Sequence, residues 1–331
     1  MSDRPRMRAF RLAALASLLA LISCVGDEPV VGTGSGPTPR QVSGSPTLSP
    51  TVAPGRGSGG DPVIAAAGDI ACSAGIPGET TCRHQATSDI LVDGDYDWIL
   101  ALGDNVYEDG TLKEFRTYFN PTWGRVKRRI LPVPGNHEYQ TQQARGYFRY
   151  FGKAAGPRGK GYYSLDIGKW HVVGLNSNCG EVSCAEGSEQ HGWLRKDLAA
   201  HRNKCTLAFW HHPRWSSGTT HGGNDDVAPL VSALYEFGAD VLLVGHEHNY
   251  ERFSPQDPEG QKDTEKGIRQ FVVGTGGKDH HLFGMPVANS EVGSADTYGV
   301  LQLTLHPGSY GWRFIPEAGR TFTDSGRTDC H

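Results

Sequence analysis

Six short, continuous apolar runs constrain the fold of this 331-residue chain most strongly. Runs of this length without polar alternation are typical of strands buried on both faces. They are PVIAAAG (62–68), DWILALG (97–103), RILPVPG (129–135), CTLAFW (205–210), DVLLVG (240–245) and RQFVVG (269–274). Helical patterns lie between them, at 86–92, 113–119, 188–201 and 228–237. This alternation predicts a layered α/β domain with a largely parallel sheet.

Two other segments have the pattern of hairpins. The stretch GYYSLDIGKWHVVGLN, residues 161–176, holds two apolar strands around a turn at 166–169. The stretch YGVLQLTLHPGSYGWRFIP, residues 298–316, turns at Pro307-Gly308. Because such residues favour tight turns, we expect an antiparallel pair in each segment.

The beginning of the chain is predicted to lie outside the folded domain. Residues 1–23 join a basic start to the apolar run 12–22, which is about half the ~20 residues that a membrane span needs, so we interpret them as a signal peptide. The run ends in LISC, which resembles the lipobox of bacterial lipoproteins and would make Cys24 the lipidated N-terminus. A plain secretory signal is the alternative.

A flexible linker is predicted next, because residues 24–60 are rich in Gly, Ser, Pro and Thr and nearly free of apolar side chains. Folded sequence is expected over 61–331, within the range of a single α/β domain. Together these segments predict an exported bacterial protein, either lipid-anchored to the outer face of the cell membrane or secreted. Contact with a membrane is expected through the lipid anchor only.

The cysteine count fits export. Seven cysteines less Cys24 leave an even set of six, which in an exported protein suggests disulfides. Sequence leaves 15 pairings open, although short loops favour Cys72–Cys82 and Cys179–Cys184 and would leave Cys205 to pair with Cys330. A zinc site is the competing interpretation, but the chain has no C-x-x-C pair.

Charge argues against nucleic acid as the main partner. The formal net charge is −4, and it falls to about −7 once residues 1–23, with four Arg and one Asp, are removed. A net negative charge of this size disfavours binding to the polyanionic backbone of nucleic acid.

Metal-type side chains follow five of the predicted strands immediately. They are, in chain order, Asp69, Asp104, Asn136, His211, and the pair His246 and His248. Each has an ordinary interpretation alone, since an Asp after a strand is often a helix N-cap and a single His is often a core or surface residue. Because ligands collect at the carboxyl ends of strands in α/β sheets, the shared position favours one metal site. Two acids, an amide and three imidazoles suit a pair of first-row metal ions better than Ca²⁺ or Mg²⁺.

The motifs around these residues resemble those of a known family. They are GD at 68–69, GDNVY at 103–107, GNHE at 135–138, HHP at 211–213 and GHEHNYER at 245–252. Their order is similar to that of the calcineurin-like metallophosphoesterases and, more narrowly, of the purple acid phosphatases. The resemblance implies an α/β fold, a layered αββα sandwich of two mixed sheets flanked by helices, with the metal site at the carboxyl ends of the strands. It also implies that 61–331 is a metallophosphoesterase catalytic domain.

One tyrosine makes the resemblance narrower. The broad superfamily usually has Asp-x-His in its first motif, whereas this chain has Ala71 at the histidine position. The purple acid phosphatases also lack that histidine and have a tyrosine three residues after the bridging Asp, as Tyr107 follows Asp104 here. A phenolate is a hard anionic ligand and favours Fe³⁺. Ala71 also departs from the family's usual GDxG.

The resemblance implies a role for each site residue. The first metal would be held by Asp69, Tyr107 and His248. The second would be held by Asn136, His211 and His246, with Asp104 bridging the two. The implied cofactors are Fe³⁺ and a divalent ion, Fe²⁺, Zn²⁺ or Mn²⁺. His137 would contact phosphate or protonate the leaving group, and His221 is placed near a further pocket histidine of the family.

The implied activity is acid phosphatase-like hydrolysis of a phosphorylated small molecule, by attack of a metal-bound hydroxide on a phosphate monoester. A phosphodiesterase or nucleotidase of the same fold with Mn or Zn is the alternative within the family. A surface protein that captures metal or phosphate without turnover is the alternative outside it. The segment GTGGKDHH, residues 274–281, supplies either a pocket loop or a Gly-rich turn with surface histidines.

Overall fold

The computed structural model describes residues 60–73, 82–201 and 205–331. The predicted signal peptide, Cys24 and nearly all of the predicted linker lie outside these residues. Within the described ranges, no helix has both the length and the apolar character needed to cross a membrane.

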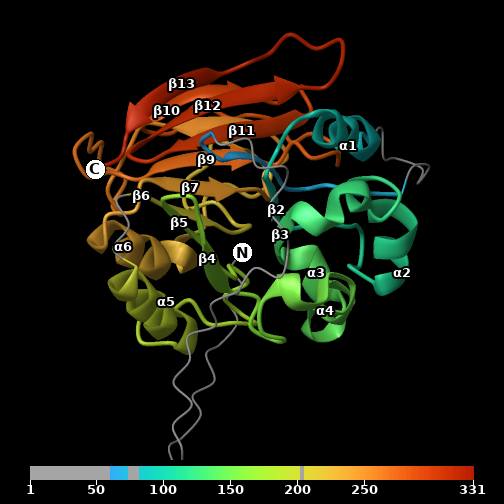
Figure 1. Ribbon diagram of the computed structural model, residues 1–331, viewed down its shortest axis with the longest axis horizontal. Coiled ribbons are helices and arrows are strands. Elements are labelled where there is room, and N and C mark those ends of the chain that lie inside the picture. Colours follow the sequence, from blue (N-terminus) through green and yellow to red (C-terminus); the bar gives the residue numbers. More distant parts are fainter. Residues whose placement is uncertain (1–59, 74–81, 202–204) are drawn as a thin grey trace, which may run out of the picture. The chain divides into compact units, whose positions relative to one another are not determined.

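One six-stranded sheet has the order β13-β12-β11-β1-β2-β3 (Figure 1). Its parallel part consists of β1 (Val63–Ala67), β2 (Trp98–Leu102) and β3 (Ile130–Val133), which correspond to the first three predicted runs. Antiparallel strands extend it on the other side of β1. They are β11 (Gly299–His306), β12 (Ser309–Pro316) and β13 (Ser325–Asp329).

A second, seven-stranded sheet has the order β10-β8-β9-β7-β6-β5-β4. Its central strands are parallel: β5 (Trp170–Gly174), β6 (Cys205–Phe209), β7 (Val241–Val244) and β9 (Arg269–Val273). The flanking strands are antiparallel to their neighbours: β4 (Tyr163–Ile167), β8 (Tyr250–Phe253) and β10 (Ser290–Ser294).

The helices lie in two groups (Figure 1). The pair α5 (Glu189–Ala200) and α6 (Ala228–Glu236) lies beside the second sheet. The residue before α5, Ser188, caps the helix because its side chain accepts a hydrogen bond from the His191 N–H. The others lie on the side of β2 and β3. They are α1 (His84–Asp93), α2 (Leu112–Glu114), α3 (Asn136–Gln140) and α4 (Arg145–Phe151).

Alternate residues of one strand enter two different cores, which accounts for the continuous apolar runs. Leu207 and Phe209 of β6 belong to the core shared with β1, β2 and β11, whereas Ala208 between them packs with residues of α5 and α6. Because successive side chains leave opposite faces of a strand, this pattern requires buried layers on both sides of the second sheet. The predicted αββα sandwich of two mixed sheets is confirmed.

The expectation of a largely parallel sheet holds only for the strands at the centre. Among the described strands, five neighbouring pairs are parallel and six are antiparallel. Both predicted hairpins are present, as β4–β5 and β11–β12, and they add antiparallel strands at the edges of the parallel cores. The apolar runs thus predicted the parallel centre of each sheet, and the hairpin patterns predicted antiparallel strands beside it.

Three disulfides follow the pairing that short loops favour. They join Cys72 to Cys82, Cys179 to Cys184 and Cys205 to Cys330. The last joins the start of β6 to the C-terminus across 125 residues. The six cysteines are therefore structural cross-links, which excludes the zinc alternative for them.

Candidate metal centre

The strand ends of both sheets supply the candidate ligands. On the first sheet, Asp69, Asp104 and Asn136 follow β1, β2 and β3, and Tyr107 lies on the loop after Asp104. On the second sheet, His211 follows β6, and the pair His246 and His248 follows β7. All seven predicted ligands lie together in one buried or half-buried cluster.

The backbone at three of these positions is strained. Asp69, Asp104 and His246 have φ of 60°, 43° and 71°, in the left-handed region that residues with a Cβ rarely adopt. Such strain costs on the order of 1–3 kcal/mol per residue and tends to occur at functional sites. The left-handed conformation at the strand ends directs these three side chains toward the cluster.

Glycines let neighbouring backbone approach the carboxylates. A Cβ at Gly135 would lie 2.1 Å from Asp104 Oδ1, and one at Gly245 would lie 2.6 Å from Asp69 Oδ2. These glycines, which precede Asn136 and His246, are therefore required by close packing at the site.

Four donor atoms form a first group around the Tyr107 hydroxyl. Its Oη lies 2.9 Å from Asp69 Oδ1, 3.1 Å from His248 Nε2 and 3.2 Å from Asp104 Oδ2. His248 Nε2 lies 3.4 Å from Asp69 Oδ1. These are the residues expected around the first metal.

A second group shares one atom with the first. His211 Nε2 lies 3.1 Å from Asn136 Oδ1, 3.2 Å from His246 Nδ1 and 3.2 Å from Asp104 Oδ2. The Oδ2 atom of Asp104 thus belongs to both groups, as the predicted bridging role requires.

The chemistry of these donors fits bound cations. The Nδ1 of His211 lies 2.9 Å from the Leu102 carbonyl and that of His248 lies 2.6 Å from the Asp279 carbonyl, so each Nδ1 donates a hydrogen bond, and in the neutral ring Nε2 keeps the lone pair that a cation would bind. Those lone pairs point at other acceptors. Ligands held at about 2.0–2.2 Å from an ion lie roughly 2.8–3.6 Å apart, depending on whether the arrangement is octahedral or tetrahedral, and the separations within both groups fall in this range.

The buried carboxylates of the cluster favour positive charge next to them. Burial alone would lower the pKa of His211, but Asp104 and Asp69 raise it to about 9. Burial would raise the pKa of Asp104, but the charges of His211 and His137 hold it below its usual range. Burial and both carboxylates raise the pKa of Tyr107 well above its usual range, and a bound cation would oppose that shift.

The two predicted catalytic histidines lie on different flanks. The His137 ring lies 4.4 Å from the Tyr107 ring, its Nδ1 is 2.6 Å from the Glu108 carbonyl, and its Nε2 is 3.9 Å from Asp104 Oδ2. The His221 ring stacks on His246 with centroids 4.1 Å apart. Both side chains therefore border the cluster, although His221 was placed there by a weaker alignment.

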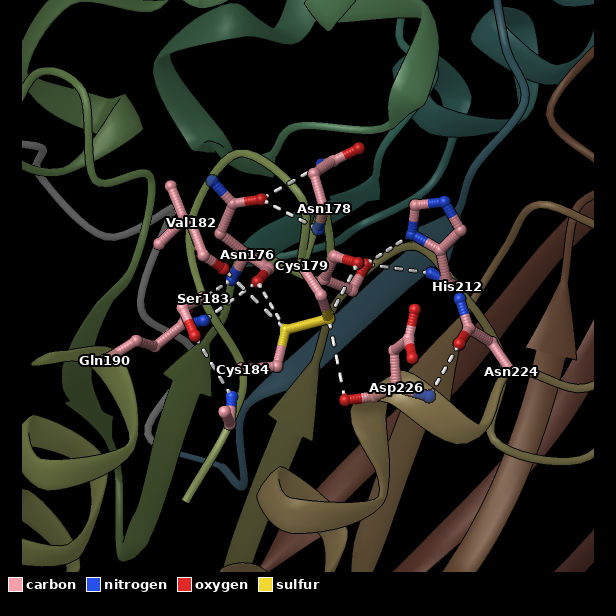
Figure 2. Close-up of a disulfide and its surroundings, with 12 residues drawn as sticks. Asn176, Asn178, Cys179, Val182, Ser183, Cys184, Gln190, His212, Asn224 and Asp226 are labelled. Atoms are coloured by element: carbon pink, nitrogen blue, oxygen red, sulfur yellow. Dashed lines mark hydrogen bonds between the residues drawn. A yellow bond between two sulfur atoms is a disulfide. The ribbon is translucent and has the colours of Figure 1, made fainter. Parts of the chain in front are cut away.

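His212, the middle residue of HHP, lies beside the candidate ligands, with its ring centroid 4.4 Å from that of His246. Its Nδ1 lies 2.8 Å from the Ser177 hydroxyl, and burial lowers its pKa to about 3. Figure 2 shows this contact beside the Cys179–Cys184 disulfide. In the same loop, the Asn178 side chain donates to the Pro134 carbonyl at 3.1 Å and so joins the loop to the residue before GNHE.

Two buried glutamates within the motifs were not assigned by sequence reasoning. The Glu138 carboxylate accepts from the backbone N–H groups of Gly135 and Asn105 at 2.7 and 2.9 Å and so joins GNHE to GDNVY. The Glu247 carboxylate accepts from the N–H groups of His221 and Gly222. Their place inside motifs was the available signal, but only the fold shows which loops they join.

Comparisons with known proteins place this chain in one family. A family model described as calcineurin-like phosphoesterase matches residues 63–250, more than half of the chain, and the chain belongs to this family. Within it, similarity to purple acid phosphatases is clear. Purple acid phosphatase 15 of Arabidopsis thaliana is 30% identical over 243 residues, which cover 62% of this chain and 42% of that protein. Acid phosphatase type 7 of Danio rerio is 30% identical over 195 residues, which cover 49% of this chain and 43% of that protein.

Solved structures share the fold. Purple acid phosphatase PPD1 from yellow lupin seeds gives a TM-score of 0.68 at 19% identity, covering 84% of this chain and 55% of that one. GAP50, the anchor in the inner membrane complex of Plasmodium, gives a TM-score of 0.62 at 14% identity, covering 82% of this chain and 89% of that one. The chain spans less than half the length of the curated relatives named above.

Proposed function

We propose that this protein is an exported dinuclear-metal phosphoesterase that hydrolyses phosphate monoesters, of the acid phosphatase type. The observation that carries the proposal is the shared Asp104 Oδ2, which lies 3.2 Å from both Tyr107 Oη and His211 Nε2 and so joins two donor groups. A single carboxylate oxygen between two such groups suits a pair of ions. Membership of the phosphoesterase family supports the reaction class.

The metal ions, when bound, would stabilise charge on the phosphoryl group and lower the pKa of a bound water. We propose Fe³⁺ for the group with the Tyr107 phenol and a divalent ion, Fe²⁺, Zn²⁺ or Mn²⁺, for the other. The chain's own contribution is to fix the ligands and to place His137. Because the His137 Nδ1–H donates a hydrogen bond to the Glu108 carbonyl, the Nε2–H of the protonated ring would be the group that gives a proton to the leaving oxygen.

Export is supported by the three disulfides, which persist in oxidising compartments. We propose that residues 1–23 direct export and that Cys24 carries a lipid anchor. Mass analysis of the mature N-terminus tests this, because a free N-terminus after another cleavage site would refute the anchor.

The decisive test of the reaction combines metal analysis with turnover of p-nitrophenyl phosphate. Wild-type protein should hold two ions per chain and release p-nitrophenol, whereas Asp104→Ala should lose both properties. Full retained activity in Asp104→Ala would defeat the mechanism. Stoichiometric metal or phosphate binding without product would favour a capture protein, and preference for a diester would favour a phosphodiesterase.

A further inference from the structure

We propose that His281 is a third imidazole of the substrate pocket, which works with His221 to bind the phosphoryl oxygen that distinguishes a monoester from a diester. The inference rests on the proposed function and names what selects the substrate at that site. His281 ends the segment GTGGKDHH, for which sequence left pocket and surface positions open.

The His281 ring lies directly against the candidate metal centre. It stacks on His248 with centroids 3.7 Å apart and planes 14° apart, in the way that His221 stacks on His246. The two outer rings lie 5.2 Å from each other. Because His248 belongs to the first donor group and His246 to the second, the outer pair spans both candidate metal positions.

A buried carboxylate orders both outer rings. Glu247, which lies between His246 and His248 in the chain, is fully buried. Its Oε1 accepts from the His221 N–H at 2.6 Å, and its Oε2 lies 3.0 Å from His281 Nδ1. One glutamate therefore fixes the loop of His221 and the ring of His281 together, and it acts as a positioning residue.

The backbone also holds this loop in place. The His281 N–H donates to the His248 carbonyl at 3.1 Å, and the Lys278 N–H donates to the Asp69 carbonyl at 2.9 Å. The loop after β9 is thus attached to two ligand-bearing segments. These contacts fix the position of His281 at the end of the loop.

The outer rings remain available to a ligand. The His281 side chain is 14% exposed and His221 is exposed. Within the described residues, neither the Nε2 of His281 nor a ring nitrogen of His221 takes part in a hydrogen bond. Both rings can therefore accept a polar group that approaches from solvent.

The chemistry of the two ester classes explains the expected selectivity. A monoester has three phosphoryl oxygens without an organic substituent, whereas a diester has two. An imidazole can share one hydrogen with the additional oxygen, either by donating to the dianion or by accepting from a P–OH group. In a diester the corresponding oxygen carries an organic group, which offers no such hydrogen bond.

The test compares His281→Ala and His281→Gln with wild-type, metal-loaded full-length protein. We expect kcat/KM for p-nitrophenyl phosphate to fall about 10- to 100-fold in His281→Ala, mainly through KM, as loss of one hydrogen bond to a charged group predicts. The Kd of inorganic phosphate, measured by calorimetry, should rise by a similar factor. Turnover of bis(p-nitrophenyl) phosphate should change less than about threefold. His281→Gln should recover part of the loss, and metal content should not change.

His201→Ala is the matched control, because the His201 ring stacks on His171 beside α5. Equal losses for both esters, no loss for either, or loss of metal from His281→Ala would overturn the inference. If the wild-type protein hydrolyses neither ester, the proposed function fails, and the phosphate titration alone decides on His281. An unchanged phosphate Kd would then refute its role.

Discussion

Removal of the Cys205–Cys330 disulfide should destabilise the protein far more than removal of a short-range one. A cross-link lowers the entropy of the unfolded chain by an amount that grows with the logarithm of the closed loop. For the 125-residue separation of Cys205 and Cys330 this gives roughly 5 kcal/mol at 25 °C, and for the 5-residue separation of Cys179 and Cys184 roughly 2 kcal/mol. Since whole domains are stable by about 5–15 kcal/mol, the long cross-link is a large share of the total.

The assay is urea unfolding followed by tryptophan fluorescence. The double variant Cys205→Ala/Cys330→Ala is compared with Cys179→Ala/Cys184→Ala, so that each loses one disulfide and two sulfurs. The free energy of unfolding should fall by roughly 3 kcal/mol more in the first variant. If the two losses are equal, loop entropy does not determine the contribution of these cross-links, and the reasoning is refuted.

Three further predictions concern the site and its support. Tyr107→Phe should abolish the visible tyrosinate charge-transfer band of iron-loaded protein; a colourless, iron-free but active wild type would contradict the Fe³⁺ assignment. His137→Ala should slow hydrolysis of alkyl phosphates by about 10²–10⁴-fold, with a much smaller effect on p-nitrophenyl phosphate, whose leaving group needs little protonation; equal losses would exclude a general acid. Burial would raise the pKa of Asp324, but its hydrogen bond with Arg252 lowers it, so its stabilisation is present above the ordinary carboxyl pKa and is lost as pH falls. Asp324→Asn should therefore destabilise the protein at pH 7 by about 1.5–3 kcal/mol, and the difference from wild type should narrow below about pH 4 in urea unfolding; a constant difference would disprove the linkage.

The sequence was most informative where a residue pattern is compatible with few structural or chemical roles. The apolar runs predicted the central strands because such runs are stable only between two buried layers. The strand-end ligands were found because Asp, Asn and His in this position have a common chemical purpose. These six residues lie together with Tyr107, as expected, while their metal binding stays a prediction.

Other features depend on contacts between distant segments and carry little local signal. The strands β8 and β13 were missed, since YERF and SGRTD have no continuous apolar run. Within GHEHNYER, Tyr250 and Arg252 both hydrogen-bond Asp324, more than 70 residues further along the chain. Those motif residues therefore support packing, which no spacing rule shows. Glu247 was overlooked for the same reason.

The division of the candidate ligands between the two sheets has a mechanical consequence. Four of them come from loops after β1, β2 and β3, and three from loops after β6 and β7. Bound ions would cross-link the two sheets, because a shift of one sheet relative to the other would separate the histidine ligands of the second sheet from the carboxylate ligands of the first. The unfolding temperature would then rise with the concentration of free metal, so the same ions would contribute both to the reaction and to the stability of the fold.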